Sequence, residues 1–200
     1  MMIAIFKWSV LIIPLCASLC GCPEDENVPP ISYETSVPNL VFVDDDRQAY
    51  GVGDTLWLNM VVPDEIILDT GTTESIYNLT EEDHTQIYFR LTKASEFEEP
   101  LLVTLAENEF VTTRGELIPR EDRPGILIAT LTRNSDAYGL RVGLLMKSTG
   151  DFNLSPDFVD VGWAFYFYDQ DYSVQPLKDV VIASSFRNAE AGLTFKFTVQ

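Results

Sequence analysis

The feature that most restricts the fold of this chain is an alternation of apolar and polar residues with a period of two. Successive side chains of a β-strand point to opposite faces, so such runs predict strands with one buried and one wetter face. The clearest runs are Ile87, Phe89 and Leu91; Tyr138, Leu140, Val142, Leu144 and Met146; and Leu193, Phe195, Phe197 and Val199. Further strands are predicted at residues 40–44, 54–62, 101–106, 109–114, 125–133, 161–168 and 179–186.

Helical periodicity is weak throughout the chain after residue 22. The best candidates, near residues 92–99 and 121–123, are short. Without helices to carry parallel crossovers, the strands should be antiparallel. We therefore expect an all-β domain, an immunoglobulin-like antiparallel β-sandwich of about eight to ten strands, with a β-barrel as the alternative.

The N-terminal segment has the features of a secretory signal peptide. Lys7 is followed by an apolar run over residues 8–19, which contains Pro14 and ends at small residues. A helix that spans a bilayer needs about 20 apolar residues, so a transmembrane anchor is the weaker alternative.

The sequence Leu19-Cys20-Gly21-Cys22 resembles the lipobox of bacterial lipoproteins. The resemblance implies that residues 1–21 are cleaved and that Cys22 becomes the lipidated first residue. Two or more acyl chains, such as palmitate, anchor a protein stably to a membrane. The chain's three cysteines lie at positions 16, 20 and 22, so the mature protein would have no disulfide and no cysteine nucleophile.

Glu24, Asp25 and Glu26 follow the predicted lipidation site directly. This acidic cluster resembles the export signal of Bacteroidota surface lipoproteins, which implies a lipid anchor in the outer membrane with cell-surface exposure. The periplasmic leaflet is the alternative. The proline-containing residues 22–39 are expected to form the lipidated, acidic, flexible linker, and residues 40–200 the all-β domain. Residues 50–58 also resemble the first core strand of β-sandwich lipoproteins of Bacteroidota.

Composition excludes several classes of partner. Hydrophobic residues make up 46% of the chain, enough for a packed core, but the formal net charge is −18. Such a surface repels phosphate groups, so we expect neither nucleic-acid binding nor polybasic docking on a membrane.

No catalytic motif accompanies His84, the single histidine. The chain has no GxSxG elbow, no HExxH sequence and no glycine-rich phosphate loop. One histidine without a usable cysteine argues against zinc. We therefore expect no enzyme activity, no metal and no cofactor, with calcium at the acidic residues 44–46 or 169–172 as a weaker alternative.

Aromatic residues provide the candidate binding site. Alternation places Trp163, Phe165 and Phe167 in the core and turns Tyr166 and Tyr168 to the opposite face. Trp57 is expected to point outward as well, because its neighbours Leu56 and Leu58 are predicted to be buried. Exposed aromatic rings could stack on sugars; cross-strand pairing beneath a loop is the alternative.

The function expected from these features is a non-catalytic binding or assembly role in the cell envelope. An outer-membrane protein is the first candidate partner, contacted through the long acidic segment 63–84. The alternative is a surface glycan-binding module that holds polysaccharide with Trp57, Tyr166 and Tyr168.

Replacement of Glu24, Asp25 and Glu26 by alanine tests the predicted surface display. We expect the variant to lose its susceptibility to protease on intact cells, because it would stay on the periplasmic leaflet. Digestion equal to that of the wild type would contradict the export signal.

Overall fold

The structure is a computed structural model of the 200-residue chain, and it describes residues 28–95, 99–158, 160–171, 173, 175–189 and 193–200. The predicted signal peptide, Cys22 and the acidic cluster Glu24, Asp25 and Glu26 lie outside the described residues. No helix in the described part of the chain is long and apolar enough to cross a membrane.

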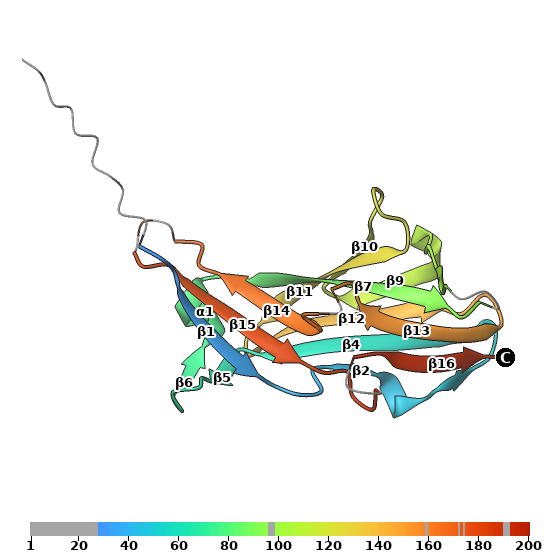
Figure 1. Ribbon diagram of the computed structural model, residues 1–200, viewed down its shortest axis with the longest axis horizontal. Coiled ribbons are helices and arrows are strands. Elements are labelled where there is room, and N and C mark those ends of the chain that lie inside the picture. The colour runs from blue at the N-terminus through green and yellow to red at the C-terminus, as the bar shows by residue number, and fades with distance from the viewer. Residues whose placement is uncertain (1–27, 96–98, 159, 172, 174, 190–192) are drawn as a thin grey trace, which may run out of the picture.

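The fold is a β-sandwich of curled, mostly antiparallel sheets, which confirms the predicted class (Figure 1). The smaller sheet has the order β1–β15–β14. Its strands are β1 (Ile31–Ser36), β15 (Lys178–Ser184) and β14 (Trp163–Tyr168).

The larger sheet has the order β2–β4–β12–β11–β7–β13–β16–β3. Its strands along this path are β2 (Val41–Val43), β4 (Thr55–Pro63), β12 (Ala137–Leu145), β11 (Ile126–Asn134), β7 (His84–Lys93), β13 (Gly150–Pro156), β16 (Phe195–Val199) and β3 (Ala49–Tyr50). Three shorter strands pair beside this path: β8 (Leu101–Leu102) with β7, β9 (Phe110–Arg114) with β12, and β10 (Glu116–Pro119) with β11.

The larger sheet curls because its outermost strands are neighbours in sequence. β2 and β3 end opposite edges of the path, yet only residues 44–48 connect them, including the 3₁₀ helix η1 (Asp44–Asp46). A second 3₁₀ helix, η2 (Glu107–Glu109), precedes β9.

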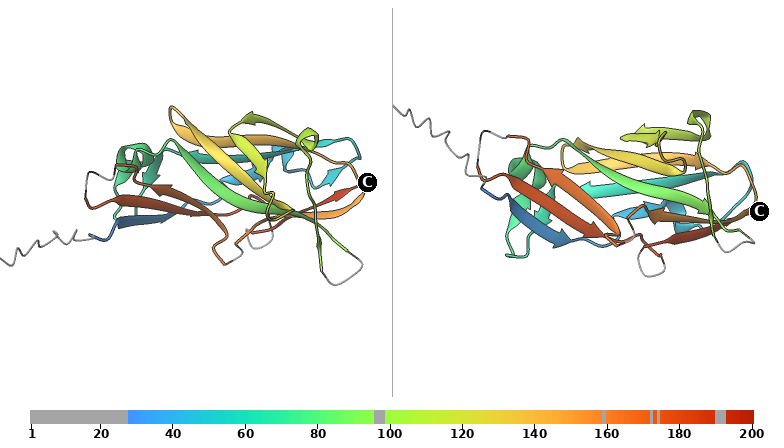
Figure 2. Two further views of the ribbon diagram at one scale, coloured as in Figure 1. Left: turned by 90° about the horizontal axis from the view of Figure 1, so that it is seen from above. Right: turned by 45° about the horizontal axis from the view of Figure 1, so that its top comes forward.

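Strand β7 connects two parts of the larger sheet, the part that contains β11 and β12 and the part that contains β13 and β16. Its residues 84–90 pair with β11, whereas residues 89–93 pair with β13. Seen from above, it crosses from the layer of β11 and β12 to the layer of β13 and β16 (left view of Figure 2). This crossing leaves the first half of β7 beside β14.

Strands β9 and β10 fill the gap where β11 and β12 diverge. β11 and β12 pair directly only over residues 132–134 and 137–139, and beyond that point β10 pairs with β11 and β9 with β12. Gly115 makes the bend between β9 and β10 with a φ of +70°. A Cβ atom there would lie 2.4 Å from the carbonyl oxygen of Thr130.

The core holds the two sheets together through aromatic side chains of β14. Trp163, Phe165 and Phe167 are fully buried, as predicted. The ring centroid of Trp163 lies 6.2 Å from that of Phe89, and the ring centroid of Phe167 lies 4.7 Å from that of Tyr138.

The segment 63–84 is folded rather than an open loop. It contains the hairpin of β5 (Glu65–Ile67) and β6 (Thr73–Ser75), followed by helix α1 (Ile76–Thr80). Asp64 connects these parts, because its carboxylate accepts hydrogen bonds from the Tyr77 amide at 3.0 Å and the Ser75 hydroxyl at 2.8 Å. Burial alone would raise the pKa of Asp64, but these bonds and the nearby Arg133 guanidinium hold that pKa below its usual range.

Three expectations from sequence need correction. The folded region begins by Ile31 rather than near Leu40, because β1 pairs with β15 inside the expected linker. Two strand pairs, β1 with β15 and β3 with β16, are parallel. Each pair joins distant parts of the chain, so the intervening domain makes the crossover and no helix is needed.

The helical segments also differ from the third expectation. Residues 92–93 belong to β7 and residues 121–123 form a turn, whereas the described α-helix, α1, lies elsewhere. Every stretch predicted to be a strand contains one. β13 was missed, because Gly150, Asn153 and Pro156 are residue types that are rare in strands.

We expect Gly115→Ala to destabilise the domain by roughly 2–4 kcal/mol, because backbone strain adds to a backbone clash. Gly71→Ala is the matched control: it also has a positive φ, of +82°, but its added Cβ meets no atom within 4 Å. Its cost should be about 1 kcal/mol. Urea unfolding monitored by tryptophan fluorescence measures both, and equal losses would contradict the tight bend at Gly115.

Candidate functional site: an aromatic hollow between two sheets

A hollow of about 540 Å³ lies where β7 of the larger sheet faces β14 of the smaller sheet. Ligand sites in proteins commonly have volumes of about 300–1,000 Å³. The residues that line it are Glu82, His84, Thr85, Gln86, Ile87, Tyr88, Phe158, Val161, Gly162, Ala164, Tyr166 and Tyr168.

The two walls follow from strand alternation. On β14, burial of Trp163, Phe165 and Phe167 turns Tyr166 and Tyr168 outward. On β7, the buried Thr85, Ile87 and Phe89 alternate with the more exposed His84, Gln86 and Tyr88, and all six except Phe89 line the hollow. The same period of two therefore forms both the core and the site.

The space between the walls exists because β13 pairs with only the second half of β7. Beside the first half, β14 approaches without forming a ladder with β7 in the described residues. One side-chain bond connects the strands: the Thr85 hydroxyl donates to the Tyr166 carbonyl oxygen at 2.7 Å. The junction therefore stays closed at its base, and the outward side chains line the hollow above it.

Tyr166 and Tyr168 form the most exposed aromatic part of the site. Their ring centroids are 6.3 Å apart and their planes differ by 10°. Tyr168 is 53% exposed, and Tyr166 is half-buried. Partial burial raises the pKa of Tyr168, with smaller contributions in the same direction from Tyr166 and Asp179. The Tyr168 hydroxyl therefore stays protonated at neutral pH and can donate a hydrogen bond.

Further apolar groups extend this surface toward the start of β14. The Tyr88 and Phe158 rings meet edge to face with centroids 6.2 Å apart. Phe158 is 56% exposed and Val161 is 49% exposed. Exposed apolar side chains that gather at a concave place are typical of binding sites.

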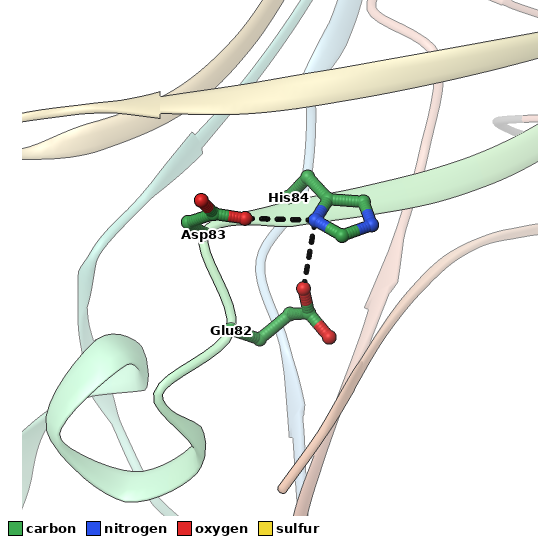
Figure 3. A group of neighbouring side chains, drawn as sticks. All are labelled: Glu82, Asp83 and His84. Atoms are coloured by element: carbon green, nitrogen blue, oxygen red, sulfur yellow. Dashed lines mark hydrogen bonds and ion pairs between the residues drawn. The ribbon is translucent and has the colours of Figure 1, made fainter. Parts of the chain in front are cut away.

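Glu82, Asp83 and His84 form the polar end of the site (Figure 3). The His84 Nδ1 atom lies 2.8 Å from a carboxylate oxygen of Glu82 and 2.8 Å from one of Asp83. The buried Glu82 also accepts a hydrogen bond from the Gln170 side-chain amide at 2.5 Å. Half of the His84 side chain is exposed.

The hydrogen bond with Asp83 raises the pKa of His84 above its usual value. The negative charges of Glu82 and Asp83 add to this effect, whereas partial burial opposes it. His84 is therefore a residue of the hollow whose charge can change near neutral pH.

The cluster offers three ligand atoms within 4.8 Å of one another, one nitrogen and two carboxylate oxygens. Such a donor set could hold a divalent cation such as zinc. The distances from Nδ1 to the two carboxylates equally suit hydrogen bonds donated by a protonated imidazole, so they do not require a metal.

The lining chemistry suits binding better than nucleophilic catalysis. In nucleophilic catalysis, a histidine base needs a side-chain hydroxyl or thiol within reach to activate. Apart from the tyrosines, Thr85 carries the one hydroxyl among the lining residues that the structure describes, and that group is bonded to Tyr166.

Trp57 lies away from this hollow. It belongs to β4, where Leu56 and Leu58 are buried as expected, and it is partly exposed. The Arg141 guanidinium lies 4.0 Å from its ring centroid, and the same side chain donates to Asp44 at 2.8 Å. The structure therefore brings together two of the three aromatic residues expected from the sequence.

The two acidic segments considered for calcium use several of their oxygens within the fold. Asp44 accepts from Asn59 and Arg141. Asp169 accepts from the backbone amides of Asp171 and Lys178. Asp44 thereby connects η1 to β4 and β12, and Asp169 connects the turn at Asp171 to the start of β15.

Sequence reasoning missed Tyr88, Phe158 and the proximity of His84 to the tyrosines. Tyr88 had a signal, since it alternates with the buried Ile87 and Phe89. Phe158 follows β13, a strand with no clear pattern, so nothing in the sequence indicated its position.

Comparison with known proteins gives only distant structural likenesses. No protein-family model and no curated protein sequence matches the chain. The human F-spondin reeler domain is similar with a TM-score of 0.39 and 11% identity, over 84% of this chain and 95% of that chain. The type II cohesin dyad from the adaptor ScaA scaffoldin of Acetivibrio cellulolyticus has a TM-score of 0.32 and 12% identity, over 80% of this chain and 50% of that one.

The pKa of His84 can be measured without assignment, because the chain has one histidine. We expect an NMR titration to give a value above the ordinary 6.5, and Asp83→Asn to lower it. Protonation then stabilises the fold at pH values below the unfolded pKa, and this contribution disappears as pH rises through the folded pKa. A wild-type pKa at or below 6.5 would contradict the cluster.

Proposed function

We propose that this protein is a non-catalytic carbohydrate-binding protein of the cell envelope. The lipidated Cys22 would anchor it in the outer membrane, and the hollow between β7 and β14 would hold a polysaccharide at the cell surface. The observation that carries the binding proposal is the partly exposed pair Tyr166 and Tyr168 at the wall of a 540 Å³ hollow.

The lining supports a sugar as the ligand. Sugar rings have apolar faces of C–H groups that pack on aromatic side chains, while their hydroxyls need polar partners. Tyr166, Tyr168 and Tyr88 offer the first kind of contact. Gln86, His84 and Glu82 offer donors and acceptors at the same hollow. An apolar cavity with a few placed polar groups is the usual composition of a specific site.

Charge favours a neutral glycan over an acidic one. The residues lining the hollow, within the described chain, include no lysine or arginine, and they include the carboxylate of Glu82. The chain as a whole carries a formal charge of −18. An acidic polysaccharide would therefore meet the Glu82 carboxylate without a lysine or arginine among the lining residues to pair with.

A protein partner in the outer membrane is the second candidate. The observation in its favour is the hairpin β5–β6, where Ile67 is 66% exposed although Ile66 and Leu68 beside it are buried. A partner that adds to this edge would cover Ile67.

Tyr166→Ala and Tyr168→Ala test the carbohydrate proposal. Loss of one aromatic contact should cost about 1 kcal/mol, which weakens binding roughly fivefold, and the double variant should bind much more weakly still. Affinity electrophoresis and calorimetry with soluble neutral polysaccharides (β-glucan, mannan and xylan) measure the effect.

Trp57→Ala is the control, because this aromatic residue lies outside the hollow. It should retain wild-type affinity once its folding is verified. If Trp57→Ala lost as much affinity for the polysaccharide as the tyrosine variants, the loss would not be specific to the hollow, and this result would contradict the assignment. Retained binding in the double tyrosine variant would refute the assignment of the hollow.

A further inference from the structure

A second hollow, of about 470 Å³, lies further along the same strand. It is formed on the outer face of β7, β13 and β16. The residues that line it are Arg90, Thr92, Pro100, Asn153, Ser155, Leu193, Thr194 and Lys196.

The two hollows share one face of β7. The residues at every second position, from His84 and Gln86 through Tyr88 to Arg90 and Thr92, line one hollow or the other. With a rise of about 3.3 Å per residue, this row extends over roughly 26 Å. In β13, Ser155 lies opposite Arg90 and Asn153 lies opposite Thr92, which widens the second half of the row into a sheet surface.

The hollows meet where the approach to β14 packs against the approach to β16. The Trp163 indole nitrogen donates to the Leu193 carbonyl oxygen at 2.7 Å. A Cβ atom at Gly162 would lie 3.0 Å from a methyl carbon of Leu193. Gly162 lines the first hollow and Leu193 the second, so these two residues mark the boundary and the hollows adjoin.

The chemistry of the second hollow differs from that of the first. Thr92, Asn153, Ser155 and Thr194 line it with hydroxyl and amide groups. The Asn153 amide donates a long hydrogen bond of 3.5 Å to the Thr92 hydroxyl, and Thr92 is 9% exposed. Such polar groups suit the hydroxyls of a sugar chain that continues beyond the aromatic stacking positions.

We infer that the two hollows form one binding surface for a linear polysaccharide, whose chain lies along β7 from the tyrosine pair to Asn153. The inference rests on the proposed carbohydrate-binding function. It adds that the protein recognises an extended stretch of a chain, with the first hollow stacking sugars and the second binding their hydroxyls.

Calorimetry with oligosaccharides of increasing length, from a disaccharide to the polymer, tests this inference on the folded domain. For the wild type, affinity should rise with length and level off once both hollows are filled. Thr92→Val combined with Asn153→Ala removes polar groups of the second hollow only. This variant should bind the disaccharide as the wild type does but lose roughly tenfold in affinity for long chains.

The outcomes separate the two proposals. Wild-type binding of short and long oligosaccharides with equal affinity, or unchanged long-chain affinity in the Thr92→Val, Asn153→Ala variant, would overturn the extended site and leave the first hollow as a saccharide site. Absence of binding to every oligosaccharide and polymer would overturn the proposed function together with this inference. Unchanged disaccharide affinity in the variant also verifies that it folds.

Discussion

The burial of alternate aromatic side chains on β14 is the interaction on which the rest of the structure depends. Trp163, Phe165 and Phe167 are fully buried and connect the smaller sheet to Phe89 of β7 and Tyr138 of β12. Fully burying a large apolar side chain contributes about 1.5–3 kcal/mol to the free energy of folding, so these three side chains together stabilise the packing between the sheets by several kcal/mol. The same burial turns Tyr166 and Tyr168 outward, so the core and the proposed site have one origin.

The position of the site depends on the course of β7 between the two layers. Because β13 leaves β7 before its first half, β14 can lie beside that half without joining its sheet. A junction of this kind has a closed base and an open outer side. Ligand sites gather at such junctions because two separate backbones supply side chains there, and each can carry a different chemistry. Here β14 supplies aromatic rings, the start of β7 supplies His84, and the residues just before β7 supply the Glu82 carboxylate.

Local sequence patterns predicted the elements better than their partners. Alternation located β7, β12, β14 and β16 and assigned their inward residues correctly. It failed for β13, which lies between β7 and β16. Glycine and proline weaken a central strand, but Gly150 and Pro156 are tolerated here because they lie at the two ends of β13. It also failed for β1, an exposed strand that has little apolar alternation and is held by pairing with β15, about 150 residues later in the chain.

By itself, the sequence determined where most of the strands lie, which of their residues are buried, and that Tyr166 and Tyr168 face away from the core. These properties follow from the two-residue period of a single strand, which is local. Only the tertiary structure decided that Tyr88, Phe158 and His84 join the tyrosines and that Trp57 lies elsewhere beneath Arg141. Those relations depend on which strands become neighbours, and that choice is made by packing between segments far apart in the chain.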